Sequence, residues 1–119
     1  MKTSAKWLLP AGLGLLLSTS PAQAALRDSL ISIRSGASMD EVVAILGTPG
    51  DRSFFGSAEA WQYCETGFAN DFFVTVWFSN GQVAGLTTEN YAGNAILCEN
   101  NFRAVDWGQL PADVVIEFR

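Results

Sequence analysis

Acid–base chemistry in this chain would have to rest on carboxylates, because the sequence contains no histidine. Neither a Ser-His-Asp triad nor a Cys-His pair can therefore form. The candidate carboxylates are Asp40 with Glu41, at the start of an apolar helical stretch, and Glu65 with Asp71, on either side of one loop. Helix capping accounts for the first pair and a solvated turn for the second. We therefore expect no catalytic residues and a protein that is not an enzyme.

The sequence does not indicate a metal or cofactor site either. The D-x-D-x-D-G spacing of a calcium loop is absent. A glycine-rich phosphate loop is absent too, since Gly12 and Gly14 fall in an N-terminal apolar segment. We expect no cofactor and no bound metal ion.

The two cysteines, Cys64 and Cys98, could be redox-active, metal-binding or structural. They lie far apart rather than in a C-x-x-C motif, and no histidine is present to complete a zinc site. In a small exported domain, such a pair is most simply one disulfide. The bond would stabilise the fold by roughly 3–4 kcal/mol in the chain-entropy picture.

Residues 1–24 have the pattern of a secretory signal peptide. Lys2 and Lys6 supply a positive start, an apolar run follows, and small residues favour cleavage between Ala24 and Ala25. A membrane anchor would need about 18 or more uninterrupted apolar residues, which this segment lacks. We therefore expect an exported chain that begins at Ala25.

The charge of the chain excludes some classes of partner. Its 119 residues include 7 basic and 12 acidic side chains, and removal of the signal segment would take away two lysines and no acid. An acidic domain of this kind is a poor ligand for nucleic acid, whose phosphates require a basic surface. It is also a poor ligand for anionic lipid headgroups. The length fits one small domain.

Two short helices are expected at the start of the exported part. Leu26, Leu30 and Ile33 recur with helical spacing over residues 25–34. Ser38 and Glu41 then form the pattern of a capping box. The second helix ends at Gly47, before Pro49. Its expected buried stripe is Met39, Val42, Val43 and Leu46.

Strand patterns follow the helices at 52–55, 59–64 and in a hairpin around Asn80-Gly81. Asn-Gly between two apolar runs is a strong signal for a tight hairpin turn. This order predicts an α+β fold in which the two short N-terminal helices pack on one face of a three- or four-stranded antiparallel meander. Residues 113–118 could add a final strand.

The hairpin carries large apolar residues on both faces. Counting outward from the turn pairs Phe78 with Val83, Trp77 with Ala84 and Thr75 with Leu86. This register places Phe73, Trp77 and Leu86 on the face away from the helices. Either a partner covers these three residues or the C-terminal tail does; a Cys64–Cys98 bond would hold the tail against that face.

Several of these residues together resemble a known family. They are Arg34-Ser35-Gly36-Ala37-Ser38, Glu41-Val42, Leu46-Gly47-Thr48-Pro49, Trp61-Gln62-Tyr63 and Val76-Trp77-Phe78-Ser79-Asn80-Gly81-Gln82-Val83. Their order and spacing are similar to those of the SmpA/OmlA (BamE-like) family of small envelope proteins. The resemblance covers about residues 25–89 and leaves 90–119 as a C-terminal extension packed on the sheet.

The resemblance implies a non-enzymatic module that binds a protein partner in the cell envelope and assists outer-membrane assembly. The chain departs from the family at the signal junction, because lipoproteins of the family carry a lipid-accepting cysteine where this chain has Ala24-Ala25. We therefore expect no covalent lipid anchor and a periplasmic protein held at the outer membrane, if at all, by its partner. The fold implied also resembles the repeat unit of β-lactamase inhibitory proteins, so a secreted inhibitor-like binding domain is the alternative.

Overall fold

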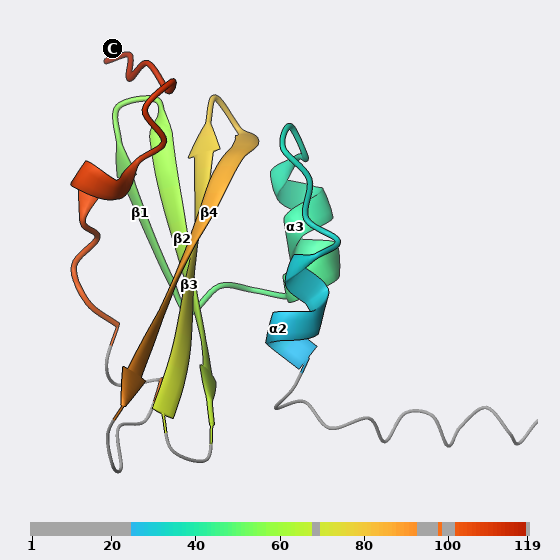
Figure 1. Cartoon of the computed structure of the whole chain (residues 1–119). Helices are drawn as coiled ribbons and strands as arrows, with labels where there is room; N and C mark the ends of the chain where they lie inside the picture. Colours follow the sequence, from blue (N-terminus) through green and yellow to red (C-terminus); the bar gives the residue numbers. More distant parts are fainter. Residues whose placement is uncertain (1–24, 68–69, 93–97, 99–101, 119) are drawn as a thin grey trace, which may run out of the picture.

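The computed structural model describes residues 25–67, 70–92, 98 and 102–118. The predicted signal segment, up to Ala24, lies outside these ranges; Ala25 is the first residue described. The elements, in chain order, are α2 (Ala25–Leu30), α3 (Met39–Leu46), β1 (Asp51–Phe55), β2 (Ala58–Thr66), β3 (Asn70–Ser79), β4 (Gln82–Ala92) and the 3-10 helix η4 (Trp107–Gln109) (Figure 1). The predicted α+β class is confirmed.

The four strands form one antiparallel meander in the order β1-β2-β3-β4, as the sequence predicted. The β3–β4 hairpin turns at Asn80 and Gly81, whose φ angles are 52° and 80°. A type I′ turn needs positive φ at both of these positions, and Asn and Gly adopt it at the lowest steric cost. The predicted hairpin turn is therefore confirmed.

The register beyond the turn differs from the prediction. Phe78 pairs with Val83 as expected, but an irregularity follows and pairs Trp77 with Gly85 and Val76 with Leu86. The extra residue, Ala84, makes a β-bulge in β4. Because strand side chains alternate between faces, one extra residue moves every later residue of β4 to the opposite face. Leu86 therefore lies on the helix side, and its assignment to the same face as Phe73 and Trp77 was wrong.

The helix α3 begins and ends where the sequence predicted. The Ser38 side chain accepts a hydrogen bond from the amide of Glu41, and the Glu41 carboxylate accepts one from the amide of Ser38. Gly47 ends the helix with a φ of 85°. The other helix prediction was too long, because α2 ends at Leu30, where the chain enters 3-10-type turns. Val43 was expected in the buried stripe but is 41% exposed.

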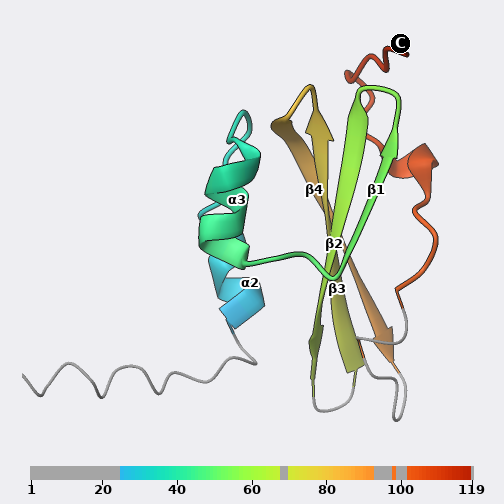
Figure 2. The same ribbon diagram turned by 180° about the vertical axis from the view of Figure 1, so that it is seen from behind.

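A single apolar cluster joins α3 to one face of the sheet. Val42 of α3 is fully buried in it together with Trp61, Val76 and Phe78, and burial of such side chains is the main source of folding free energy. Tyr63 adds a hydrogen bond from its hydroxyl to the Gly47 carbonyl, which ties the end of α3 to β2. Figures 1 and 2 show α2 and α3 on the same side of the sheet. Their partly buried side chains in the cluster are Leu26, Leu30, Met39 and Leu46.

The C-terminal tail follows β4, and the structure describes Cys98 and residues 102–118 of it. Residues 102–118 run along the other side of the sheet in both views (Figures 1 and 2). Cys64 and Cys98 form the predicted disulfide, with their Cα atoms 5.5 Å apart. Residues 113–118 form no strand, contrary to expectation. These residues reach the β1–β2 turn, where the Glu117 amide donates a hydrogen bond to the Ser57 hydroxyl.

The structure also corrects the interpretation of one acidic pair. Glu65 and Asp71 were expected in a solvated turn, but Glu65 belongs to β2 and Asp71 to β3. Asp71 is only 3% exposed. The strands extend further into the predicted loop than the polar composition indicated, because pairing continues as far as Thr66 with Asp71.

Within the described residues, no helix has the length and apolar character needed to cross a membrane.

Candidate functional site

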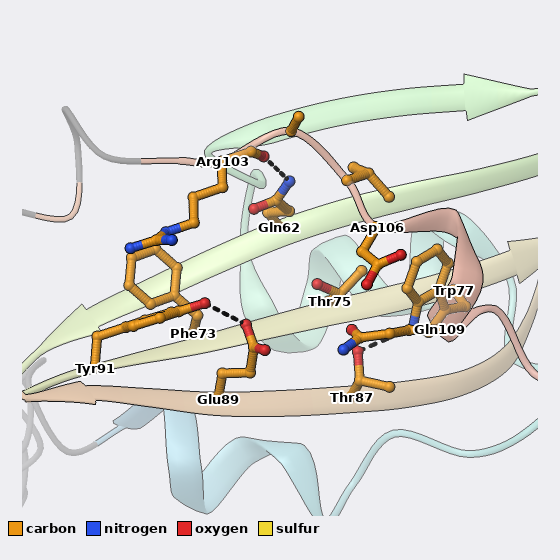
Figure 3. Close-up of a pocket in the computed structure, with 12 residues that line it drawn as sticks. Gln62, Phe73, Thr75, Trp77, Thr87, Glu89, Tyr91, Arg103, Asp106 and Gln109 are labelled. Atoms are coloured by element: carbon orange, nitrogen blue, oxygen red, sulfur yellow. Dashed lines mark hydrogen bonds between the residues drawn. The ribbon is translucent and has the colours of Figure 1, made fainter.

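A cleft of about 180 Å³ lies between the tail and the sheet face that it covers (Figure 3). One wall comes from β2, β3 and β4, and the other from the start of the tail and η4. Polar and charged groups from both walls face the cleft, over a floor that includes aromatic rings. The lining residues are Gln62, Phe73, Thr75, Trp77, Thr87, Glu89, Tyr91, Arg103, Ala104, Val105, Asp106 and Gln109.

The strand register places the sheet wall. Gln62 pairs with Thr75, which pairs in turn with Thr87, and Phe73 pairs with Glu89. Directly paired residues point to the same face of a sheet, so one row of side chains crosses three strands. Trp77 lies at one end of this wall, where it is 1% exposed and its indole Nε1 donates to Thr87 Oγ1 at 3.0 Å.

The tail is fixed over the sheet by aromatic packing. The ring centroids of Trp107 and Trp77 are 5.7 Å apart, and those of Phe102 and Phe73 are 6.0 Å apart, both pairs edge to face. Trp107 also packs against Phe55 at 5.5 Å. Edge-to-face pairs at these distances are favourable beyond the area that they bury.

Hydrogen bonds also fix the tail wall of the cleft. The Gln62 side-chain amide donates to the Arg103 carbonyl at 2.9 Å, which joins β2 to the first residues of the tail. Asp106 accepts a hydrogen bond from the Gly108 amide through Oδ1 at 2.9 Å and so caps η4. The Asp106 side chain is thus held by the start of η4, and Figure 3 shows it entering the cleft from the wall opposite Glu89.

One cation and two carboxylates set the electrostatics of the cleft. The Arg103 guanidinium lies 4.2 Å from the centre of the Tyr91 ring. The Tyr91 hydroxyl donates to Glu89 Oε1 at 2.8 Å. This hydrogen bond to Glu89 raises the pKa of Tyr91 above its ordinary value, and slight burial adds to the shift. Like any tyrosine of ordinary pKa, Tyr91 is protonated at neutral pH, and its hydroxyl therefore donates to the Glu89 carboxylate and holds it in place.

The described residues that line the cleft carry one more negative than positive charge, with Glu89 and Asp106 against Arg103. Among the described residues, the recorded hydrogen bonds use one oxygen of Glu89 and one of Asp106, which leaves the second oxygen of each to a ligand. Arg103 already has its guanidinium stacked on Tyr91. An ammonium or guanidinium group entering from solvent would thus meet two carboxylates and the side-chain oxygens of threonine and glutamine.

The structure places the residues predicted from sequence in three different surroundings. Phe73 and Trp77 line the cleft and contact the tail. Leu86 packs with the cluster under the helices instead. Cys64 and Cys98 hold the tail to β2.

Sequence reasoning missed the polar residues of the cleft. Glu89 and Tyr91 follow Thr87 at alternate positions of β4, and this period-2 pattern was the available signal for a shared face. Arg103 and Asp106 gave no such signal, because the tail segment that carries them is neither helix nor strand.

Comparison of the chain with protein-family models, curated proteins and solved structures found no match.

Proposed function

We propose that the chain is a non-enzymatic, exported protein-interaction module that binds a basic side chain of a partner protein in the cleft between the sheet and the tail. The observation that carries this proposal is the pair of carboxylates, Glu89 and Asp106, which enter the cleft from opposite walls. The acidic balance of the whole chain, 12 acids against 7 bases, would favour the approach of a basic partner.

The architecture supports a binding role because the two faces of the sheet differ. In this proposal the helices α2 and α3 close one face as a fixed apolar layer, and the disulfide-tethered tail covers the other. The tail leaves room for a ligand beneath it, since the cleft remains between Trp77 and the loop that carries Asp106. A rigid sheet that presents polar groups from one wall and a tethered segment from the other is a pre-organised binding site.

The sequence and the disulfide support the proposed cellular setting. The signal-like segment predicts export, and a disulfide is typical of oxidising compartments. The resemblance to the SmpA/OmlA family favours a partner in the envelope, as a factor in outer-membrane assembly. The chain would act there without a covalent lipid anchor.

A titration with short peptides tests the chemistry of the cleft. A lysine- and arginine-containing peptide should shift the NMR signals of Thr75, Thr87 and Gln109, whereas an acidic peptide of the same length should not. Glu89→Gln and Asp106→Asn keep the hydrogen bonds to Tyr91 and Gly108 but remove the charge. Each should weaken binding of the basic peptide by up to about fivefold, as for an exposed ion pair.

The matched control is Asp40→Asn, which removes an exposed negative charge from α3, on the other side of the sheet. It should leave the affinity unchanged. Equal weakening by all three variants would show that the peptide responds to net charge alone and would contradict a site in the cleft. Identification of the natural partner distinguishes a role in envelope assembly from an inhibitor-like role. An envelope-assembly factor as partner supports the assembly role, and a hydrolase whose activity falls on binding supports the inhibitor-like alternative.

A further inference from the structure

A second cluster of reactive side chains lies outside the cleft, around the disulfide. The sulfur atoms of Cys64 and Cys98 and a carboxylate oxygen of Asp71 all lie within 4.8 Å of one another. Asp71 is 3% exposed, and its buried Oδ2 has no hydrogen-bond partner among the residues that the structure describes. Thr66 is close by, with its Oγ1 3.1 Å from Cys98 Sγ.

The strand register explains how these residues meet. Thr66 pairs with Asp71, and Cys64 pairs with Phe73 two positions further on. Alternation then puts Cys64, Thr66 and Asp71 on one face of the sheet. This is the face covered by the tail, and the tail contributes Cys98.

The buried carboxylate oxygen needs a positively charged or proton-donating neighbour. An unpaired buried acceptor is destabilising, and more so when it is charged. A disulfide cannot donate a hydrogen bond to this oxygen, because neither sulfur carries a proton. Two thiols could donate to Asp71, and a metal cation could bind all three groups at once.

We propose that Cys64, Asp71 and Cys98 bind a thiophilic divalent cation of the zinc type once the disulfide is reduced. A dithiol reductant supplies two electrons and two protons, so that the S–S bond breaks, both cysteines become thiols and the reductant becomes a disulfide. The zinc ion then displaces the two thiol protons into solvent and binds two thiolates and the Asp71 carboxylate. Cysteine and aspartate are both ordinary zinc ligands.

The backbone geometry accommodates the ion. Zinc–sulfur bonds of about 2.3 Å at a tetrahedral angle place two sulfurs roughly 3.8 Å apart. The Cα atoms of Cys64 and Cys98 are 5.5 Å apart, so side-chain rotation alone separates the sulfurs to that distance. Three protein ligands leave a fourth position for water or for the Thr66 hydroxyl.

The proposed ion gives the tail a second means of attachment. In oxidised protein the disulfide holds the tail to β2, and in reduced protein the zinc ion bridges the same two residues. The cover over Phe73 and Trp77, and the cleft beside them, would then persist in both redox states. The sequence alone argued against zinc for want of histidine, and it gave no sign that Asp71 lies beside the cysteines.

The test uses the full-length exported chain, reduced with a phosphine so that no added thiol competes for metal. With Co²⁺ as probe, reduced protein should develop a thiolate-to-cobalt charge-transfer band and the visible bands of tetrahedral coordination. Competition with a chromophoric chelator should show one Zn²⁺ per chain. Oxidised protein and the double variant Cys64→Ser, Cys98→Ser should show neither signal.

Asp71→Asn separates a three-ligand site from a simple pair of thiols. It should weaken zinc binding roughly tenfold or more, by analogy with the loss of supporting groups in other metal sites. Glu65→Gln is the matched control: Glu65 Oε2 is also buried and has no partner within the described part of the chain, but Glu65 pairs with Phe72 on the opposite face of the sheet. It should leave zinc affinity unchanged.

Circular dichroism shows whether the reduced chain stays folded. A reduced chain that loses structure should regain it on addition of zinc. Failure of zinc to restore the fold, or equal zinc affinity in wild type and Asp71→Asn, would overturn the proposal.

Discussion

Truncation of Trp77 to alanine should be among the most destabilising single changes in this chain. The side chain is 1% exposed, packs edge to face on Trp107 and donates its indole hydrogen to Thr87. Replacing a fully buried tryptophan by alanine costs about 3–5 kcal/mol. This is a large share of the roughly 5–15 kcal/mol that stabilises a typical domain.

The loss is measurable by urea unfolding of oxidised protein, followed by far-ultraviolet circular dichroism because tryptophan fluorescence changes with the substitution itself. With a urea slope of about 1.5 kcal/mol per molar for a domain of this size, the midpoint should fall by roughly 2–3 M. Phe54→Ala is the matched control, since Phe54 is an aromatic residue of the same sheet that is 76% exposed. It should change stability by no more than about 0.5 kcal/mol.

The result that would refute this reasoning is a Trp77→Ala variant as stable as Phe54→Ala. Trp77 would then be open to solvent in the free protein, and the tail would not cover this face. Trp107→Ala provides an independent check, because it removes the cover while leaving Trp77 in place. It should destabilise the fold by less than Trp77→Ala, since Trp107 is only half-buried.

Four further outcomes are expected. Reduction of the Cys64–Cys98 bond in metal-free buffer should lower the free energy of unfolding by roughly 3–4 kcal/mol, measured by urea unfolding with and without reductant. Gly81→Val should destabilise the hairpin by more than about 1 kcal/mol, because Gly81 has a φ of 80° that a β-branched residue adopts only with strain; thermal melting of the variant measures this. Burial raises the pKa of Tyr63 to about 12, whereas an unfolded tyrosine titrates near 10. The contribution of Tyr63 to the free energy of unfolding is therefore full below about pH 10 and is lost as the pH rises towards 12. Tyr63→Phe should abolish this part of the alkaline destabilisation. Arg103→Gln should strengthen binding of the basic peptide, because Arg103 carries the one positive charge among the described residues that line the cleft; an unchanged or weaker affinity, measured by titration, would count against a cation site.

The parts of the fold that local chemistry determines were predictable from sequence. Ser38 and Glu41 satisfy each other's amides within one turn of helix, and Asn80-Gly81 specifies a tight hairpin by its own backbone preferences. The Cys64–Cys98 bond followed from there being two cysteines in a chain expected to be exported. None of these predictions required knowledge of contacts between distant segments.

The errors came from contacts between distant segments. The bulge at Ala84 shifts the register, and it sets Gly85 opposite Trp77 under the tail. A Cβ at Gly85 would lie 2.9 Å from Pro111 Cγ, so this glycine lets the tail approach β4. The alternation of residues along one strand cannot predict a bulge that is favourable only because a segment some 25 residues away packs against it.

The candidate cleft was only half predictable. Phe73 and Trp77 were placed on a face that needed a cover, and the alternating apolar pattern was sufficient for that inference. Arg103 and Asp106 reach the cleft because the aromatic rings of Phe102 and Trp107, next to them in sequence, anchor the tail. Such a segment has no periodicity of its own, so its position follows from packing alone.

The most direct test of the central claim, that a partner protein binds in the cleft, is site-specific photo-crosslinking in living cells that export the protein. A photoreactive residue at Gln109, an exposed position on the cleft wall, is compared with one at Ile31, which is 87% exposed after α2. The account predicts a discrete adduct from position 109, its reduction by Glu89→Gln together with Asp106→Asn, and none from position 31. An adduct from position 31 alone, or one from position 109 that is indifferent to the loss of both carboxylates, would contradict it.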